Sequence, residues 1–267
     1  MYNADPKLAL RDLNAGYSAD AVLRGISLDI AGGSITAIVG PNGSGKSSLL
    51  KALARKLAPT SGAVLLDGVS LSEISRSSLA ESVQLLGTRP ATRASDTVFE
   101  LVSKSAQRAE SLSRSSPRLR EEVNSLLART GILNLAERPL GELSSGARQC
   151  ALIASALARN PEVLLLDEPT TALDYSHQLE VINLLSSLRR ERGMTIIAVF
   201  HDLNLAARFA DKVVMLKQGQ IAAIGGAHEV ITPANLATVF HILARVIEDP
   251  VGKTPLVVPI RQLDEPA

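Results

Sequence analysis

The chain has little cysteine, few aromatic residues and almost no net charge. Its single cysteine, Cys150, excludes an intramolecular disulfide framework and a multi-cysteine metal site, and we expect it to be a small buried apolar side chain. Tryptophan is absent and aromatic residues make up 3% of the 267 residues, which argues against platforms that stack nucleic-acid bases. The 28 basic and 27 acidic residues leave a net charge of +1. This balance gives no electrostatic argument for binding to nucleic acid or to an anionic membrane surface.

Long hydrophobic runs are also missing. The longest, from Cys150 to Ala158, covers about nine residues and contains Ser155, whereas a membrane span needs about 18. Residues 1–17 mix charged and apolar side chains and show no secretory leader. We therefore expect a soluble protein of a reducing compartment, whose membrane role, if any, depends on a partner.

Short apolar runs alternate with amphipathic stretches, a pattern typical of parallel strands joined by helices. Three runs are almost continuously apolar and predict central strands buried on both faces: Ser34–Val39, Glu162–Leu166 and Thr195–Phe200. Each is followed directly by turn-forming or polar residues. Because ligands of open α/β sheets lie beyond the carboxyl ends of the strands, we expect the three segments to bring functional residues to one edge.

Other segments predict elements around this core. Partly alternating runs predict a flanking antiparallel β layer: Ala9–Leu13, Ile26–Ile30 and Gly62–Leu66. The middle of the chain predicts two helices, the second capped by Ser116 and ended by Gly131: Thr97–Ser105 and Pro117–Thr130. The C-terminal part predicts a hairpin around Gly219, a helix opened by Thr232 and an irregular strand-like tail: Lys212–Leu216 with Gln220–Ile224, and Ile247–Pro259.

These elements predict one domain over 1–267 with a helical insertion. The α/β core and its β layer would occupy 1–87 and 160–230, a helical subdomain 88–159 and a C-terminal extension 231–267.

The segment Gly40–Ser47 fits the phosphate-loop pattern G-x-x-x-x-G-K-[ST] in full. Its glycines allow backbone N–H groups to surround phosphate oxygens, Lys46 supplies a charge for the β- and γ-phosphates, and the Ser47 hydroxyl is suited to Mg²⁺. A buried strand precedes the loop and a helix starting near Lys46 follows it, with its positive end toward the phosphates. An ordinary glycine-rich turn is the alternative, and this context argues against it.

Asp167 and Glu168 follow the strand that ends at Leu166. A carboxylate at that place can hold Mg²⁺ through water, and an adjacent carboxylate can polarise an attacking water molecule. Two solvated acids at a strand end are the alternative.

Further motifs stand in an order that matches a known family. Leu143-Ser144-Ser145-Gly146-Ala147 lies between the phosphate loop and Asp167, Ala172-Leu173-Asp174 comes next, His201 follows a strand, and Tyr17 precedes the loop. With these motifs the chain resembles, over nearly its whole length, the nucleotide-binding subunit of an ATP-binding-cassette (ABC) transporter. In that family they correspond to the signature motif LSGGQ, the D-loop, the switch histidine and the aromatic residue on adenine. Taken alone, Tyr17 could equally pack, and His201 could be a satisfied strand-end histidine.

The resemblance implies an α/β fold with a P-loop NTPase core of RecA-like type and Mg²⁺-dependent hydrolysis of ATP. Two copies of the chain would face each other head to tail around two ATP molecules, and hydrolysis would reopen the pair. Glu168 would act as general base, His201 would orient the γ-phosphate, and Asp174 would couple the two sites. The remaining implied contacts are Gly40, Pro41, Asn42, Gly43, Ser44, Gly45, Lys46, Ser47 and Ser48 on the phosphates, Leu143, Ser144, Ser145 and Gly146 from the other copy, and Ser47 with Asp167 on the metal.

Two departures from the family pattern concern hydrolysis. Ser145 and Ala147 replace the first glycine and the final glutamine of the signature. The family also places a metal-contacting glutamine at the entrance to the helical insertion, where this chain has Thr88. Either Thr88 is a weak substitute, or the register differs and Gln84, within the predicted strand Ser82–Leu86, is relevant.

A narrower resemblance concerns cargo and partners. The segments His201–Asp211 and Asp249–Pro255 are similar to the corresponding segments in the ATPase subunits of importers of ferric siderophores, haem and cobalamin. This implies two transmembrane permease subunits, an extracytoplasmic binding protein and a peripheral place on the cytoplasmic face of the inner membrane. The ATPase subunit is not expected to touch the cargo.

Alternatives of other classes remain. One is a regulatory nucleotide-binding module that has lost turnover, suggested by Thr88 and Ala147. Another is a soluble ABC ATPase acting on nucleic acid, which the single cassette and the lack of a basic stripe disfavour. An exporter subunit is a variant of the main hypothesis.

Overall fold

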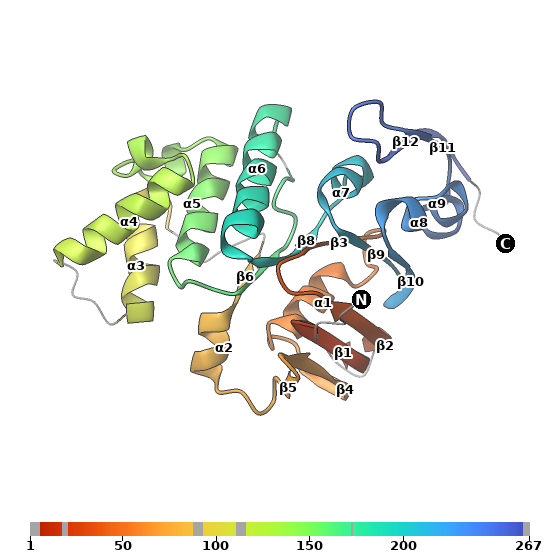
Figure 1. Ribbon diagram of the computed structural model, residues 1–267, viewed down its shortest axis with the longest axis horizontal. Coiled ribbons are helices and arrows are strands. Elements are labelled where there is room, and N and C mark those ends of the chain that lie inside the picture. The colour runs from red at the N-terminus through yellow and green to blue at the C-terminus, as the bar shows by residue number, and fades with distance from the viewer. Residues whose placement is uncertain (1–5, 18–20, 88–92, 111–115, 172, 264–267) are drawn as a thin grey trace. The chain divides into compact units, whose positions relative to one another are not determined.

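The structure, a computed structural model, describes residues 6–17, 21–87, 93–110, 116–171 and 173–263. The chain forms two compact units, the first from 1–75 with 195–267 and the second from 76–194. In Figure 1 the first unit carries the red-to-orange and blue ends of the colour bar, and the second carries the yellow-to-green middle. The predicted helical subdomain, 88–159, lies within the second unit, and its boundaries stay a prediction. In the described part of the chain, no helix has the length and apolarity to cross a bilayer.

The first unit contains the predicted antiparallel layer, with strand order β2-β1-β4-β5. Its strands are β1 (Leu8–Gly16), β2 (Ala21–Ile30), β4 (Pro59–Leu66) and β5 (Val69–Ser70). They extend further than the sequence indicates because the pairing is irregular. The register of β1 shifts between Leu10 and Leu13, and Asp12 has a left-handed φ of 44°, so the alternation of buried and exposed residues is lost there.

The same unit contains a second group of strands, in the order β10-β9-β3-β8. They are β3 (Ile35–Val39), β8 (Thr195–Val199), β9 (Lys212–Lys217) and β10 (Gln220–Gly225). β3 runs parallel to both β8 and β9, and every residue of β3 and β8 is buried, as predicted for central strands. The predicted hairpin is β9–β10, which turns at Gln218 and Gly219 with φ values of 50° and 79°.

Helices and a small sheet complete the first unit. The helices are α1 (Lys46–Leu53), α7 (Leu203–Phe209), α8 (Ala227–Val230) and α9 (Pro233–Phe240), the last capped by Thr232 as predicted. The C-terminal tail is not one irregular strand. It forms an antiparallel hairpin of β11 (Ile242–Glu248) and β12 (Pro255–Gln262), because the chain reverses at Asp249, whose carboxylate accepts the Val251 N–H at 2.9 Å.

The second unit combines two parallel strands with a group of helices. The strands are β6 (Val83–Leu86) and β7 (Val163–Leu166). The helices are α2 (Arg76–Ser82), α3 (Val98–Glu110), α4 (Pro117–Arg129), α5 (Ser145–Leu157) and α6 (Tyr175–Arg192), with short 3₁₀ turns η1 (Leu133–Leu135) and η2 (Leu140–Glu142). Ser116 stands at the N-cap of α4 as predicted but makes no side-chain capping bond, and Gly131, at φ 73°, follows the helix end.

Cys150 lies on α5 and is 5% exposed. Burial, together with the nearby charge of Glu180, raises the pKa of its thiol to about 11. The thiol is therefore protonated at neutral pH, which confirms the expectation of a buried apolar role.

Candidate functional site

The loop Gly40–Gly45 joins the buried strand β3 to α1 in the first unit. Its glycines have φ values of 150°, 77° and 101°, which side-chain-bearing residues rarely adopt. A Cβ at Gly40 would lie 2.3 Å from the carbonyl oxygen of Leu216 on β9, so that position has no space for any other residue. The loop closes through a hydrogen bond of 3.2 Å from the Ser44 N–H to the Pro41 carbonyl. The conformation of the loop is therefore possible only for a glycine-rich sequence.

Two polar side chains are buried at this site, one within the loop and one directly after it. Lys46, the first residue of α1, is 6% exposed, and its Nζ donates to the carbonyls of Gly40 and Pro41 at 2.8 and 2.9 Å. Ser44 is 2% exposed, and its hydroxyl finds no hydrogen-bond partner among the described residues. Buried polar groups usually have partners, because leaving one unsatisfied costs free energy. A buried ammonium beside an unsatisfied hydroxyl suits an anionic ligand.

Tyr17 stands near the same helix. Its hydroxyl accepts a hydrogen bond of 3.0 Å from Lys51 and lies 3.4 Å from the Ser48 hydroxyl, both on α1. The Lys51 ammonium is 5.2 Å from the ring centroid, and Tyr17 is still 60% exposed. The edge of the ring is thus fixed to α1 while much of its surface is accessible to a ligand.

In the second unit, Asp167 and Glu168 follow the fully buried strand β7, and both are half-buried. The Asp167 N–H donates to the Leu86 carbonyl at 3.0 Å, which continues the pairing of β6 and β7 beyond their ends. Glu168 has a φ of 56°, a left-handed conformation that costs a non-glycine residue about 1–2 kcal/mol. Such strain is commonly found where function fixes the residue.

The segment Leu143–Gly146 leads into α5, as predicted for a signature at a helix start. Ser144 is the N-cap, and its hydroxyl accepts the Ala147 N–H at 3.2 Å. Ser145 and Gly146 form the first turn. The N–H groups of a first helical turn have no acceptor within the helix and favour anions.

Asp174 caps the next helix, α6, and contacts a residue that sequence reasoning missed, His177. Asp174 Oδ1 accepts the His177 N–H at 2.9 Å and lies 2.8 Å from the ring Nδ1. These contacts lower the pKa of Asp174, the backbone hydrogen bond contributing most. The His177 ring packs directly on Gly146, where an added Cβ would lie 2.2 Å from its Cδ2.

His177 therefore joins Asp174, the predicted D-loop residue, to the start of α5, the predicted signature helix, within one unit. The histidines show no metal-ligand spacing, so the sequence predicts no role for His177. The only available signal is the Asp-x-x-His spacing at a helix start, which is typical of side-chain capping.

His201 belongs to the first unit, where it follows β8 and is exposed. Asp202, the next residue, caps α7 by accepting the N–H groups of Asn204 and Leu205. Of the remaining predicted residues, Thr88 lies outside the described residues, as does Ala172 of the D-loop. Gln84 lies within β6, and its amide donates to the carbonyls of Ala80 and Val83, so it is satisfied within its own segment.

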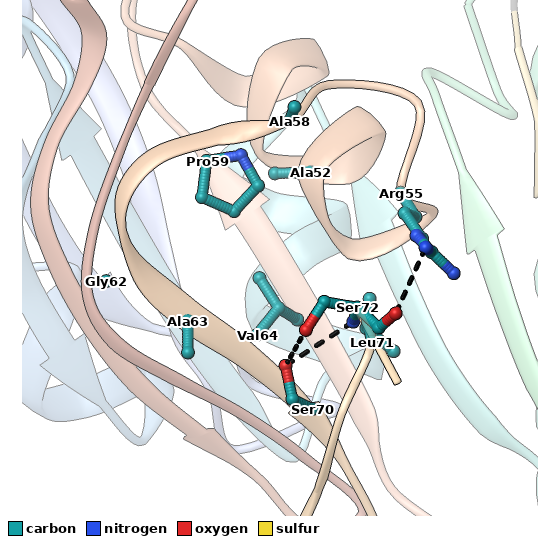
Figure 2. A pocket seen from close by; sticks show the side chains of 10 residues that line it. All are labelled: Ala52, Arg55, Ala58, Pro59, Gly62, Ala63, Val64, Ser70, Leu71 and Ser72. Carbon is teal, nitrogen blue, oxygen red and sulfur yellow. Dashed lines mark hydrogen bonds between the residues drawn. The ribbon is translucent and has the colours of Figure 1, made fainter. Parts of the chain in front are cut away.

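Two hollows lie near these segments. One, of about 380 Å³, lies between the end of α1, strand β4 and residues 70–72 (Figure 2) and is lined by none of the predicted site residues. The other, of about 690 Å³, lies in the second unit and includes Ser144, Ala147 and His177 in its lining. The second hollow thus borders the signature helix.

Comparisons with known proteins agree with this arrangement. Residues 23–171 match the protein family described as ABC transporter. The ferric enterobactin transport ATP-binding protein FepC of Escherichia coli (strain K12) is 40% identical over 255 residues, covering 95% of this chain and 94% of that protein. The iron(3+)-hydroxamate import ATP-binding protein FhuC of Bacillus subtilis (strain 168) is 40% identical over 250 residues, covering 93% of each chain.

A solved structure adds to this likeness. The dimeric post-hydrolysis state of the ATP-binding cassette MJ0796, bound to ADP and Pi, superposes with a TM-score of 0.74 at 27% identity and covers 82% of this chain and 98% of that one. The predicted fold class is confirmed. The family match over more than half of the chain, and the relatives of similar length, show that this chain is a member of the ABC transporter family.

Proposed function

We propose that the chain is the ATP-hydrolysing subunit of an importer for a metal chelate, namely a ferric siderophore, haem or cobalamin. The observation that carries this proposal is the identity of 40%, over nearly the full length, to proteins named for transport of ferric enterobactin and iron(3+)-hydroxamate. The glycine-dependent phosphate loop with its buried Lys46 supports the ATP-binding part independently.

ATP would bind with its phosphates in the loop Gly40–Gly45. Lys46 Nζ is held there by two neutral carbonyls, which a phosphate oxygen could replace with a stronger, charge-assisted hydrogen bond. The unsatisfied Ser44 hydroxyl could donate to the same phosphates. The exposed ring of Tyr17 would stack on adenine.

The residues fit Mg²⁺ as the metal. Ser47 and Asp167 offer a hydroxyl and a carboxylate, and Mg²⁺ usually binds one or two protein oxygens together with water and substrate phosphates. Among the described residues, no group of three or more His, Cys, Asp or Glu could hold a metal ion. When bound, the metal would neutralise charge on the phosphates.

Hydrolysis would need residues from two copies of the chain. Glu168 would accept a proton from the attacking water, and His201 would orient the γ-phosphate. The other copy would present the first turn of its α5, with Ser144, Ser145 and Gly146, to the same phosphate. The two-copy arrangement is supported by the dimeric structure of the related cassette.

The relatives' names, which describe ATP-binding proteins of transport and import, support partners in the membrane. We infer two membrane-spanning permease subunits, with this chain bound peripherally at the cytoplasmic face of the inner membrane and an extracytoplasmic binding protein that delivers the chelate. ATP-driven pairing and separation of the two copies would move the permease between its states.

The test is transport by the complex purified with its membrane partners and placed in lipid vesicles. We expect Mg²⁺-dependent ATP hydrolysis and ATP-dependent uptake of at least one of ferric enterobactin, a ferric hydroxamate or hemin. Lys46→Ala should abolish both. Bound ATP without turnover would favour the regulatory module instead, and salt-sensitive RNA or DNA binding would favour the nucleic-acid hypothesis.

Tyr17 gives a second test of nucleotide binding. We expect Tyr17→Ala to weaken ATP binding by about 1–3 kcal/mol, roughly 5- to 150-fold in Kd, because stacking on the base is lost. Tyr17→Phe should retain most of the affinity. Titration with inorganic triphosphate, which has no base, should give the same Kd for Tyr17→Ala and the unchanged chain. Equal losses for both ligands would indicate that Tyr17 only packs against α1.

A further inference from the structure

The C-terminal hairpin is tied to the helix that follows His201. Asn204, in the first turn of α7, bonds both main-chain groups of Val257 on β12. The Val257 N–H donates to Asn204 Oδ1 at 2.7 Å, and Asn204 Nδ2 donates to the Val257 carbonyl at 3.3 Å. A side-chain amide thus occupies the position that a neighbouring strand would take at the edge of β12.

A second contact joins the same face of α7 to the turn of the hairpin. Arg208 stands one helical turn after Asn204, and its Nε lies 4.0 Å from Asp249 Oδ2. The Asp249 carboxylate is largely shielded from solvent, and its pKa is lowered chiefly by hydrogen bonds from the Val251 and Gly252 N–H groups, with help from Arg208. At neutral pH it is therefore an anion that holds the turn and faces Arg208.

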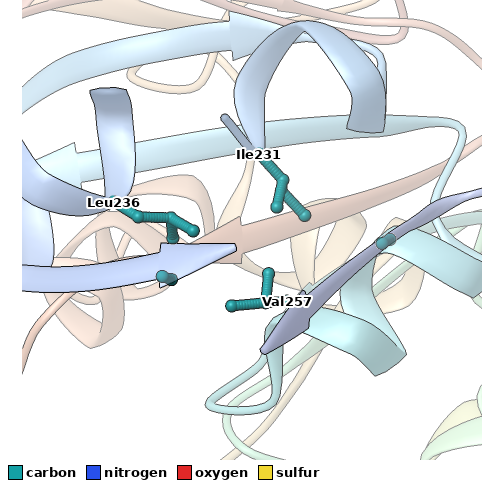
Figure 3. Close-up of a cluster of buried hydrophobic side chains, with 5 residues drawn as sticks. Ile231, Leu236 and Val257 are labelled. Atoms are coloured by element: carbon teal, nitrogen blue, oxygen red, sulfur yellow. The ribbon is translucent and has the colours of Figure 1, made fainter. Parts of the chain in front are cut away.

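An apolar cluster lies beside these polar contacts (Figure 3). Ala207 of α7 is buried together with Val257 of β12 and Ala244 of β11. The remaining fully buried members are Ile231 and Leu236. The hairpin and α7 therefore share one packed core in addition to their hydrogen bonds.

The length of α7 makes these contacts important. The helix has seven residues, and a helix this short is not stable in water without tertiary packing. Its cap is Asp202, the neighbour of the exposed His201. His201 therefore lies between the end of β8, where the Phe200 N–H donates to the Ile38 carbonyl at 3.0 Å, and the start of α7, so its position depends in part on what holds α7.

We propose that the C-terminal hairpin is a brace for α7 that keeps His201 in place for ATP hydrolysis, with Asn204 as the positioning residue. The inference rests on the proposed function of His201 at the γ-phosphate. It also connects the two distant segments of the narrower family resemblance, His201–Asp211 and Asp249–Pro255, because Arg208 of the first contacts Asp249 of the second.

The test is the ATPase rate of the assembled complex with Asn204→Ala. We expect kcat to fall by about 10- to 100-fold, since small displacements of a positioned group cost rates of that size, while KM for ATP changes little. In the background of His201→Ala, the same substitution should cause no further loss, because the group whose position matters is absent. Asn204→Asp, which retains the acceptor for the Val257 N–H, should recover part of the rate.

Asn235→Ala is the matched control. Asn235 also bonds a backbone carbonyl of the C-terminal region, that of Val230 at 2.8 Å, but within the described part of the chain its side chain bonds neither α7 nor the hairpin. It should leave kcat unchanged. In hydrogen exchange, Asn204→Ala should accelerate the amides of 203–209, and this readout does not require hydrolysis.

Three results would overturn the brace: an unchanged kcat for Asn204→Ala, the same relative loss with and without His201, or unchanged exchange in α7. If instead the proposed ATPase function is wrong, the experiments would give a different set of results. In that case the unaltered complex would not hydrolyse ATP and His201→Ala would have no effect, whereas exchange in α7 would still respond to Asn204→Ala.

Discussion

Replacement of Glu168 by glutamine is expected to lower ATP turnover at least about 100-fold while ATP binding and ATP-dependent pairing of the two copies persist. A positioned general base contributes about 10²–10⁴ to a rate, and a neutral amide cannot accept the proton of the attacking water. The phosphate loop, which lies elsewhere in the sequence, is unchanged. Phosphate release measures the turnover, and sedimentation of the chain with Mg²⁺ and ATP measures the pairing.

The backbone at Glu168 makes this substitution specific. Glutamine has the same size and experiences the same strain at a φ of 56°, so the free energy of unfolding should change little. Glu162→Gln is the control, because this exposed carboxylate stands just before the same strand, β7, at its other end. Turnover at the unaltered rate in Glu168→Gln would refute its role as general base and direct attention to Asp167.

The parts of the site that the sequence predicts are those that depend on local chemistry. A phosphate loop needs glycine at Gly40, since a Cβ would collide with the Leu216 carbonyl, and this requirement is visible in the residue types alone. The central strands were predictable because burial on both faces leaves a continuous apolar run, as in β3 and β8. The left-handed backbone of Glu168 could not be predicted, because glutamate gives no indication of it.

The parts that escaped prediction depend on contacts between distant segments. The sequence predicts an irregular tail where the structure has the C-terminal hairpin, because β12 contains two prolines and no alternation of apolar and polar residues marks it. Its partner β11 is the preceding strand, but the residue that bonds its edge, Asn204, lies 53 positions from Val257 in the sequence. The contact of His177 with Gly146 is of the same kind, since residue spacing cannot show that α5 and α6 bring them together.

Gly146→Ala is expected to destabilise the chain and to reduce ATP turnover together. Alanine in place of glycine within a helix ordinarily stabilises it by about 1 kcal/mol. Here the new Cβ would lie 2.2, 2.4 and 2.7 Å from Cδ2, Cγ and Cβ of His177. Rotation of the ring relieves the first two contacts but not the last, so the two helices must separate. Such overpacking costs about 1–3 kcal/mol, and we expect the unfolding midpoint to fall by a few degrees, at about 2–4 °C per kcal/mol.

Turnover should fall because the displaced residues belong to two segments that we propose to act in hydrolysis. Moving His177 breaks its contact with Asp174, and moving the start of α5 shifts the first-turn N–H groups proposed to meet the γ-phosphate. We expect a loss of at least about 10-fold, since displacements near 1 Å can cost about 100-fold. The measurements are thermal unfolding and phosphate release. Gly32→Ala is the control for both, because a Cβ there would meet only the Lys7 Cβ at an ordinary 3.7 Å.

The double variant Gly146→Ala with His177→Ala separates the collision from the loss of glycine itself. Removing the ring leaves room for the new Cβ, so stability should recover relative to Gly146→Ala alone, with an interaction energy of about 1–3 kcal/mol between the two sites. Turnover should stay low, because Asp174 has then lost the side chain that joins it to α5. Recovery of turnover along with stability would mean that His177 only fills space. Additive effects on stability would mean that its ring does not pack on Gly146 in the folded protein.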